Sequence, residues 1–290
     1  MALEKKSPCK VNLLLNILGK RPDGFHELET VMHPIALFDD IHCERGGNGI
    51  QITCDEPALP ADSQNLVYRA ADAFFKLHNP GDGVRLHLQK RIPLAAGLGG
   101  GSGNAATTLL ALNELFDGPL STAKLNELAA ALGSDVPFFL QNRPALATGR
   151  GEQIRPLDFF PALRGKAFLL IHPGFGIATA WAYQNLARFP AALNGRQGRA
   201  EKLVSLLRAG DWRAAGGEFY NSLEAPALEK YPVLALFQEF LRTNGALATL
   251  MSGSGSTTFA IVENIAVGEA LGEKFKSRFG ANCWTAVVAI

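Results

Sequence analysis

The chain has 290 residues, of which 47% are hydrophobic, and its formal net charge is +1. A chain of this length and composition can bury a sizeable core and suits one large domain or two smaller ones. No window concentrates Lys and Arg, so the charge gives little support to a nucleic-acid-binding or membrane-surface protein and favours a small-molecule ligand.

The cysteines and the N-terminal segment bear on localisation. No stretch reaches the roughly 18 apolar residues of a membrane span. The segment "VNLLLNIL" is interrupted by Asn12 and Asn16, and no small-residue cleavage site follows it, so it does not indicate a signal peptide. We expect a cytoplasmic protein with reduced thiols. Four cysteines are scattered without CxxC spacing: Cys9, Cys43, Cys54 and Cys283.

Short strands are predicted across residues 11–55. The segments "VNLLLNI", "ETVMHPIAL", "DIHCE" and "GIQIT" are rich in apolar or β-branched residues, and turn signals such as "RPDG" separate them. The segment "NLVYRAADAFFKLHNPGDG" then changes to helical spacing, with a stop at Pro80 and Gly81. The first part of the chain is therefore predicted to be a strand meander followed by a helix.

A glycine-rich segment, "IPLAAGLGGGSGNAATTLLALNEL", occupies residues 92–115. It joins the alternating strand pattern "VRLHLQK" to a helix predicted for residues 104–116. Glycines let a backbone approach a ligand and direct several N–H groups at one anion, and a helix N-terminus adds its positive dipole end. The segment lacks the GK[ST] of a Walker A loop, and Ser102 breaks the dinucleotide fingerprint. A phosphate-binding loop and an unpatterned glycine turn both remain open.

The next helix is predicted for residues 122–132, ending at Gly133, with Asp135 following in "GSDVPFFL". Periodicity is lost in "PLDFFPALRGK". We therefore place a domain boundary near residue 160, between an N-terminal domain of residues 1–160 and a C-terminal domain of residues 161–290.

The second part of the chain reads as a new series of strands and helices. Both parts are predicted to be mixed α+β. The predicted elements are strand 167–172, helices across about 178–243, strand 246–251, the glycine turn "SGSGS", strand 257–263, helix 264–278 and strand 283–289.

Three segments besides the glycine loop carry a family resemblance. They are "SPCKVNLLLNILGKRPDGFHELETV", "GSDVPFFL" and "MSGSGST", the last of which can cradle an anion or turn a hairpin. Together with "GLGGGS" they closely resemble the GHMP kinase superfamily, from Ser7 through the final strand. The resemblance implies an N-terminal domain of the ribosomal protein S5 domain 2 type and a C-terminal ferredoxin-like domain.

The resemblance also implies an activity. ATP and Mg²⁺ are the implied cofactors, and no metal ligand is indicated. The segment "RPDGFHE" implies ATP-dependent phosphorylation of the 2-hydroxyl of a cytidine diphosphate-linked methylerythritol, in the non-mevalonate pathway of isoprenoid precursor synthesis. The protein is expected to bind neither nucleic acid nor membrane and to be a monomer or a homodimer.

Catalytic and ATP-binding roles follow from the same resemblance. Asp135 is implied as the group that takes or orients the hydroxyl proton, and Lys10 as the cation that faces it and the transferring phosphate. From the residues alone, Asp135 also fits a cap or turn, Lys10 a solvated lysine and Asn65 a helix N-cap. The implied ATP contacts are Asn65, Pro93, Leu94, Ala95, Ala96, Gly97, Leu98, Gly99, Gly100, Gly101, Ser102, Gly103 and Asn104.

Substrate contacts are implied at one polar and several aromatic positions. Phe25 can stack on cytosine while His26 meets the hydrogen-bonding edge of the base. Two alternatives remain. Phe25 can be a core residue beside a surface His26, and Tyr183 can be a core residue of its helix. The implied substrate contacts are Asn12, Phe25, His26, Thr179 and Tyr183.

The chain departs from the family pattern at three positions. Gly103 stands where the family usually has serine, Phe25 where tyrosine is common, and Cys9 where alanine is usual. Three other functions stay open: a GHMP kinase with homoserine, mevalonate or a sugar as acceptor, a non-catalytic nucleotide-binding homologue, and a nucleic-acid module related to ribosomal proteins.

Overall fold

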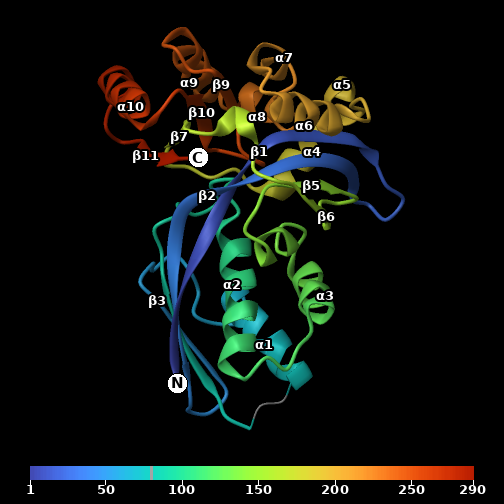
Figure 1. Ribbon diagram of the computed structural model, residues 1–290, viewed down its shortest axis with the longest axis vertical. Helices are drawn as coiled ribbons and strands as arrows, with labels where there is room; N and C mark the ends of the chain where they lie inside the picture. The colour runs from blue at the N-terminus through green and yellow to red at the C-terminus, as the bar shows by residue number, and fades with distance from the viewer. Residues whose placement is uncertain (79–80) are drawn as a thin grey trace. The chain divides into compact units, whose positions relative to one another are not determined.

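A computed structural model describes residues 1–78 and 81–290 (Figure 1). Pro80, part of the predicted stop of the first helix, lies outside them. The described residues form two compact units, each assembled from separate segments. Unit 1 comprises Met1–Cys9, Leu37–Pro93 and Gly99–Asn142, and unit 2 comprises Lys10–Ala36, Leu94–Leu98 and Arg143–Ile290. The domain boundary near residue 160 stays a prediction.

Two long strands open the chain, β1 (Ala2–Lys20) and β2 (His26–Arg45). The prediction of several short strands was wrong here, because "ETVMHPIAL" and "DIHCE" are parts of one strand. Phe38 and Asp39, which separate the two segments in the sequence, do not form a turn. Instead, the carboxylate of Asp39 is buried and accepts hydrogen bonds from the backbone N–H groups of Arg91 and Ile92.

In unit 1, part of β2 and two further strands form a sheet with helices on one face. β2 pairs antiparallel with β4 (Val84–Gln89) through residues 40–45, and β4 pairs parallel with β3 (Ile50–Cys54). Val84, Leu86 and Leu88 are buried while Arg85 and His87 are exposed, as the alternating pattern predicts. One face of the sheet is therefore covered and the other is open.

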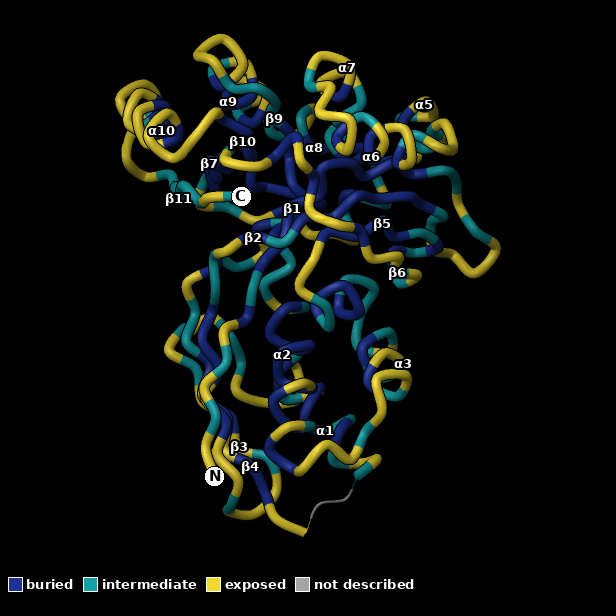
Figure 2. The backbone as a smooth tube through the Cα atoms, in the orientation of Figure 1, coloured by how far each residue is buried: buried dark blue, intermediate teal, exposed yellow. Residues whose placement is uncertain are grey.

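The helices of unit 1 are α1 (Leu66–His78), α2 (Gly100–Leu115), α3 (Thr122–Leu132) and the 3₁₀-helix η1 (Pro137–Leu140). α2 is buried over most of its length (Figure 2) and packs against α1 and η1. It begins four residues before the predicted start, because Gly99 takes a left-handed conformation and the glycines that follow are helical. α3 has the predicted bounds.

Unit 2 contains the other parts of β1 and β2 together with three short strands that the sequence did not indicate. β5 (Ala145–Thr148) pairs antiparallel with residues 30–32 of β2 and with β6 (Gln153–Pro156). β8 (Tyr220–Asn221) pairs parallel with β1 at Leu14 and Leu15. These strands have two to four residues, too few to show a periodicity.

A four-stranded antiparallel sheet forms the C-terminal part of unit 2. It is built from β7 (Ala167–His172), β9 (Ala248–Met251), β10 (Thr258–Val262) and β11 (Trp284–Ala289) in the order β11-β7-β10-β9. This is the ferredoxin-like order, and it confirms the α+β prediction for this part.

Seven α-helices of the described chain and the 3₁₀-helix η2 (Pro161–Leu163) accompany these sheets in unit 2. α9 and α10 contribute Phe237, Leu241 and Phe275 to a core shared with Leu169 and Ile171 of β7. α10 ends one residue beyond its predicted limit. The α-helices are α4 (Thr179–Leu186), α5 (Pro190–Leu193), α6 (Arg199–Ala209), α7 (Trp212–Gly216), α8 (Glu224–Lys230), α9 (Pro232–Thr243) and α10 (Ile265–Phe279).

Candidate functional site

The glycine loop requires glycine at two positions for conformational reasons. Gly97 and Gly99 have φ angles of 76° and 69°, in the left-handed region that side chains disfavour. At Gly97 a Cβ would also lie 2.1 Å from the carbonyl oxygen of Ser252. The segment before α2 therefore takes a tight path that exposes its backbone.

The N-terminus of α2 is suited to an anion. Its N-cap, Gly99, provides no side-chain hydrogen bond to the first turn. The N–H groups of a first turn have no acceptor within the helix, and they stand at the positive end of its dipole. A phosphate group would satisfy them, so the chemistry of residues 99–102 fits a nucleotide phosphate.

Gly103 is the position where the family usually has serine, and packing explains the change. A Cβ at Gly103 would lie 2.4 Å from the carbonyl oxygen of Pro8 and 3.2 Å from the hydroxyl of Ser7. Both residues are in β1, against which the first turn of α2 packs. In this chain a serine at position 103 would require β1 or α2 to move.

Asn104, the next residue, fixes α2 to the strands of unit 1. Its side-chain amide donates to the Ser7 hydroxyl at 2.9 Å and to the Asp39 carboxylate at 2.9 Å. Lys90, just before the loop, forms a buried ion pair with Asp39 and donates to the Asn104 oxygen at 3.2 Å. This network was not predicted from the sequence. Its only signal was the acidic pair within a strand-like segment.

Lys10 is held in unit 2 beside the glycine loop. It is 3% exposed, which excludes the solvated alternative. Its ammonium donates to the side-chain oxygen of Asn12 at 2.6 Å and to the carbonyl oxygen of Gly97 at 3.4 Å. The Asn12 amide in turn donates to the Thr30 hydroxyl at 2.8 Å. The strand thus directs the predicted cation toward the loop.

The second glycine turn, residues 252–256, packs against residues 96–97 of the loop. The Ser252 hydroxyl donates to the carbonyl oxygen of Gly97 at 2.9 Å, and the N–H of Thr257 donates to that of Ala96 at 3.1 Å. The buried Asn221 amide donates to the carbonyl of Gly253 at 2.7 Å. Neither Asn221 nor this pairing of the two turns was predicted.

Two further predicted contacts lie in this part of unit 2. The Thr179 hydroxyl lies 3.0 Å from that of Ser254, so Thr179 belongs to the surroundings of the second turn. The rings of His26 and Tyr183 are 5.1 Å apart, and burial lowers the pKa of His26. The structure therefore brings together a polar and an aromatic part of the predicted substrate site.

Phe25 is a surface residue. Its side chain is 51% exposed, which removes the alternative of a core phenylalanine. The guanidinium carbon of Arg150 lies 4.6 Å from the centre of the Phe25 ring. Arg150 was not among the predicted site residues, because no local pattern marks it.

The remaining predicted residues lie in unit 1. Asn65 is the N-cap of α1: its side-chain oxygen accepts from the N–H of Val67 at 2.9 Å, and its amide donates to the carbonyl of Pro60. Asp135 is half-buried in the connection between α3 and η1. Lys10 and Asp135 belong to different units, and their pairing stays a prediction of the family resemblance.

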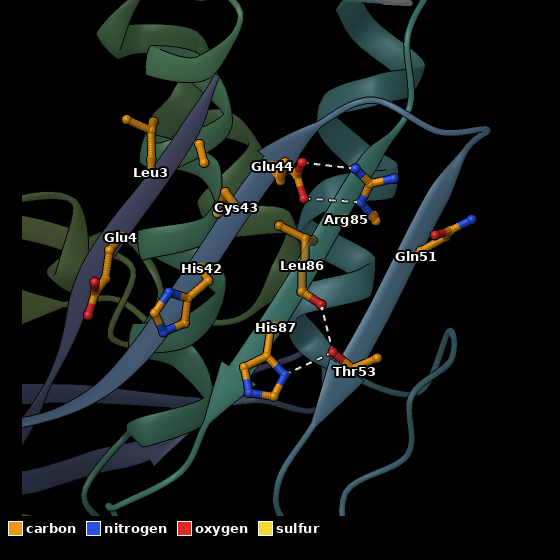
Figure 3. A pocket seen from close by; sticks show the side chains of 11 residues that line it. Leu3, Glu4, His42, Cys43, Glu44, Gln51, Thr53, Arg85, Leu86 and His87 are labelled. Atoms are coloured by element: carbon orange, nitrogen blue, oxygen red, sulfur yellow. Dashed lines mark hydrogen bonds and ion pairs between the residues drawn. The ribbon is translucent and has the colours of Figure 1, made fainter.

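A hollow of about 450 Å³ lies on the open face of the unit 1 sheet (Figure 3). Exposed polar side chains line it and already pair with one another: the Thr53 hydroxyl lies 2.8 Å from His87 Nδ1, and Glu44 forms an ion pair with Arg85. None of the predicted site residues lines it. This hollow is therefore separate from the candidate site.

Two features are absent from the part of the chain that the structure describes. Within residues 1–78 and 81–290, no three His, Cys, Asp or Glu side chains are placed to hold a metal ion together. In the same part of the chain, no helix has both the length and the apolar composition needed to cross a membrane.

Known proteins resemble this chain over nearly its whole length. A 4-diphosphocytidyl-2-C-methyl-D-erythritol kinase of Synechococcus sp. (strain JA-3-3Ab) is 41% identical over 262 residues, covering 89% of this chain and 84% of that protein. The enzyme of the same name from Geobacter sulfurreducens is 39% identical, with 90% of each chain covered.

Solved structures give the same result for the fold. A crystal structure of a 4-(cytidine 5'-diphospho)-2C-methyl-D-erythritol kinase has a TM-score of 0.82 and 34% identity, covering 99% of this chain and 100% of that chain. A homoserine kinase from Cytophaga hutchinsonii has a TM-score of 0.76 at 20% identity, covering 100% of this chain and 94% of that chain, and supports the fold alone.

Family models match both parts of the chain. Residues 65–143 match the GHMP kinases N terminal domain, and residues 203–281 match the GHMP kinases C terminal domain. The glycine loop and Asp135 fall within the first match, and the second glycine turn within the second. The chain belongs to the GHMP kinases.

Proposed function

We propose that this protein catalyses the ATP-dependent phosphorylation of the 2-hydroxyl of 4-diphosphocytidyl-2-C-methyl-D-erythritol. One structural observation carries the choice of acceptor: an exposed Phe25 directly precedes His26, whose ring lies 5.1 Å from that of Tyr183. Homoserine and mevalonate contain no planar base for such a group to recognise. The names of the relatives at about 40% identity support the same acceptor.

The residues of the loop would bind the nucleotide. We assign residues 93–104 to the triphosphate, with backbone N–H groups at the start of α2 as the donors, and Asn65 to the adenine end. Bound Mg-ATP would supply the phosphoryl group. Mg²⁺ usually keeps several of its waters when it binds with a nucleotide, so it would be held mainly by phosphate oxygens and water.

Two side chains would act on the transfer itself. Lys10, oriented by Asn12, would stabilise negative charge on the transferring group, a role that suits a cation held in a buried site. Asp135 would orient the acceptor hydroxyl and take its proton at a carboxylate oxygen. Such positioning and electrostatic effects account for most of the catalysis in phosphoryl transfer.

The cytidine end would be recognised in unit 2. Phe25 and Tyr183 would provide aromatic faces, and His26 would meet the polar edge of the base. Asn12 and Thr179 would contact other polar groups of the substrate. We further propose that the protein works in the cytoplasm, as a monomer or a homodimer.

The test measures ADP formed from Mg-ATP in the presence and absence of 4-diphosphocytidyl-2-C-methyl-D-erythritol. We expect acceptor-dependent ADP in the wild type, and a loss of at least a hundredfold in kcat in Asp135→Asn, because the amide cannot take the proton. Asp158→Asn, at a site whose side chain is 87% exposed, is the matched control and should keep full activity.

Other outcomes would replace the proposal. ADP formed only with homoserine or mevalonate would assign a different acceptor. Tight ATP binding without ADP from any acceptor would indicate a nucleotide-binding homologue that does not transfer phosphate.

A further inference from the structure

We propose that Arg150 determines specificity for the nucleotide-linked end of the substrate, by binding its diphosphate while lying on the Phe25 ring. The inference rests on the proposed function, since it concerns the acceptor named there. It gives a role to Arg150, which was not among the site residues predicted from the sequence.

The backbone that carries Arg150 is a tight turn between β5 and β6. Gly149 and Gly151 have φ angles of 71° and 107°, and the N–H of Gly151 donates to the carbonyl of Thr148 at 3.0 Å. The N–H of Arg150 donates to the Glu152 carboxylate at 2.7 Å. The carbonyl of Gly149 accepts from the N–H of Leu28 at 2.9 Å, which attaches the turn to the start of β2.

The backbone that carries Phe25 is held in a similar way. The N–H of Arg21 donates to the carbonyl of Phe25 at 2.8 Å, and the N–H of Gly24 donates to that of Arg21 at 3.1 Å. The Asp23 carboxylate accepts from the N–H of Phe25 at 3.1 Å. The ring and the guanidinium therefore come from two hydrogen-bonded turns that meet at Leu28, and their contact at 4.6 Å is a feature of the fold.

The two arginines near Phe25 differ in how far ion pairs compensate their charges. Arg21 contacts Asp23 at 3.1 Å and Glu27 at 2.7 Å, so its charge is compensated on two sides. Among the described residues, Arg150 has one ion pair, in which its Nε lies 3.8 Å from Glu152. That distance is too long for a hydrogen bond, and the Arg150 side chain is partly exposed, so its N–H groups are available to a ligand.

A guanidinium stacked on a ring keeps its N–H bonds in its own plane. These bonds point outward past the rim of the ring and not into its face. A base stacked on the other face of Phe25 would carry its ribose and diphosphate past the same rim. Guanidinium and diphosphate match in charge and in geometry, because two parallel N–H groups can bind two phosphate oxygens. We therefore assign the diphosphate to Arg150.

The experiment compares competitive inhibition by cytidine and by CDP in wild type, Arg150→Met and Arg150→Lys. Methionine keeps apolar contact with Phe25 but removes the charge and the donors. We expect Arg150→Met to raise the Ki of CDP and the KM of the acceptor about tenfold, while the Ki of cytidine, the KM of ATP and kcat change less than twofold. The Ki of CDP for Arg150→Lys should fall between those of wild type and Arg150→Met, because the ammonium keeps the charge but lacks the two parallel N–H groups.

Arg155→Met is the matched control. Arg155 lies on the neighbouring strand β6, is half exposed and pairs with Glu201, so its loss should leave both inhibition constants unchanged. An unchanged Ki of cytidine in Arg150→Met also shows that the variant is folded at the site.

Each other outcome identifies which statement fails. An unchanged Ki of CDP in Arg150→Met overturns the inference, and so do equal rises for cytidine and CDP, which would make Arg150 part of the stacking surface only. A wild type that forms no ADP with the acceptor and binds neither inhibitor overturns the proposed function and the inference together. A wild type that turns over the acceptor, with Arg150→Met indistinguishable from it, overturns the inference alone.

Discussion

His33 is a buried imidazole in unit 2 whose surroundings resist protonation. It is 1% exposed and lies among the rings of Phe159, Phe160 and Phe168. Its Nδ1 donates to the carbonyl of Pro34 at 2.8 Å, and burial lowers its pKa from 6.5 to about 4. As the pH falls below 6.5, the unfolded chain binds a proton that the folded protein does not accept. The folded state therefore loses stability between pH 6.5 and about 4.

This side chain alone should make unfolding strongly pH dependent. We expect it to lower the free energy of unfolding by about 2 kcal/mol between pH 7 and pH 5, from 1.4 kcal/mol per pH unit below 6.5. His33→Phe should lack this contribution, whereas His42→Gln, at an exposed position, should keep it. Urea unfolding at both pH values measures the difference. Parallel slopes for wild type and His33→Phe would contradict the assignment.

At the scale of elements, the start of α2 depends on the absence of a side chain at residue 103. Gly103→Ala would place a methyl group 2.4 Å from the backbone carbonyl of Pro8, which cannot rotate away as a flexible side chain would. We expect a loss of about 1 to 3 kcal/mol in the free energy of unfolding, as for other overpacked sites.

A second helical glycine gives the control for this prediction. Gly216 in α7 has open space where a Cβ would stand, so Gly216→Ala should be neutral or should stabilise by up to about 1 kcal/mol. Thermal unfolding of the two variants should therefore give shifts of opposite sign. A stable Gly103→Ala protein would show that α2 and β1 separate easily.

The helices and strands also show how much of the fold could be predicted from the sequence. Periodicity was sufficient for α3 and β7, whose bounds were predicted, and for β4, whose end was predicted to within one residue. It failed where tertiary contacts decide: glycines disfavour a helix locally, yet α2 begins at Gly100 because that turn packs closely on β1. It also divided β2, because a buried Asp39 paired with a lysine 51 residues away has no local signature.

The residues of the candidate site also differ in whether the sequence could predict them. The motifs identified Lys10, the glycine loop and the "GFH" segment, because each is continuous in the sequence. The structure adds Arg150 and Asn221, which reach their partners through turns and strands far along the chain. A motif could not predict them, because Phe25, which Arg150 contacts, and Met251 and Gly253, which Asn221 bonds, lie 30 or more residues away in the sequence.

At the scale of the whole molecule, the two units share their longest strands. β1 and β2 each contribute residues to unit 1 and to unit 2. Loss of either unit would therefore remove the pairing partners of a strand in the other. We expect the units to unfold together, in one cooperative transition.

The aromatic residues make this prediction measurable. All three tryptophans, Trp181, Trp212 and Trp284, lie in unit 2, so tryptophan fluorescence follows that unit alone. Hydrogen exchange of peptides from α1 and α2 follows unit 1. Both signals should have the same urea midpoint. A midpoint for α2 that differs by more than about 0.5 M from that of the fluorescence, roughly 1 kcal/mol at typical slopes, would show independent units.

The interleaved chain also has a consequence for synthesis on the ribosome. Leu15 and Ile17 of β1 pack in one cluster with Leu223 and Phe237, and β1 pairs with β8 at residues 220–221. The last segment of unit 1 ends at Asn142, whereas unit 2 needs the chain up to Ile290. At about 5–20 residues per second, translation of the 223 − 17 = 206 residues from Ile17 to Leu223 takes roughly 10–40 s. The apolar part of β1 is thus made first and covered last, and it is the segment that a nascent-chain chaperone would have most time to bind.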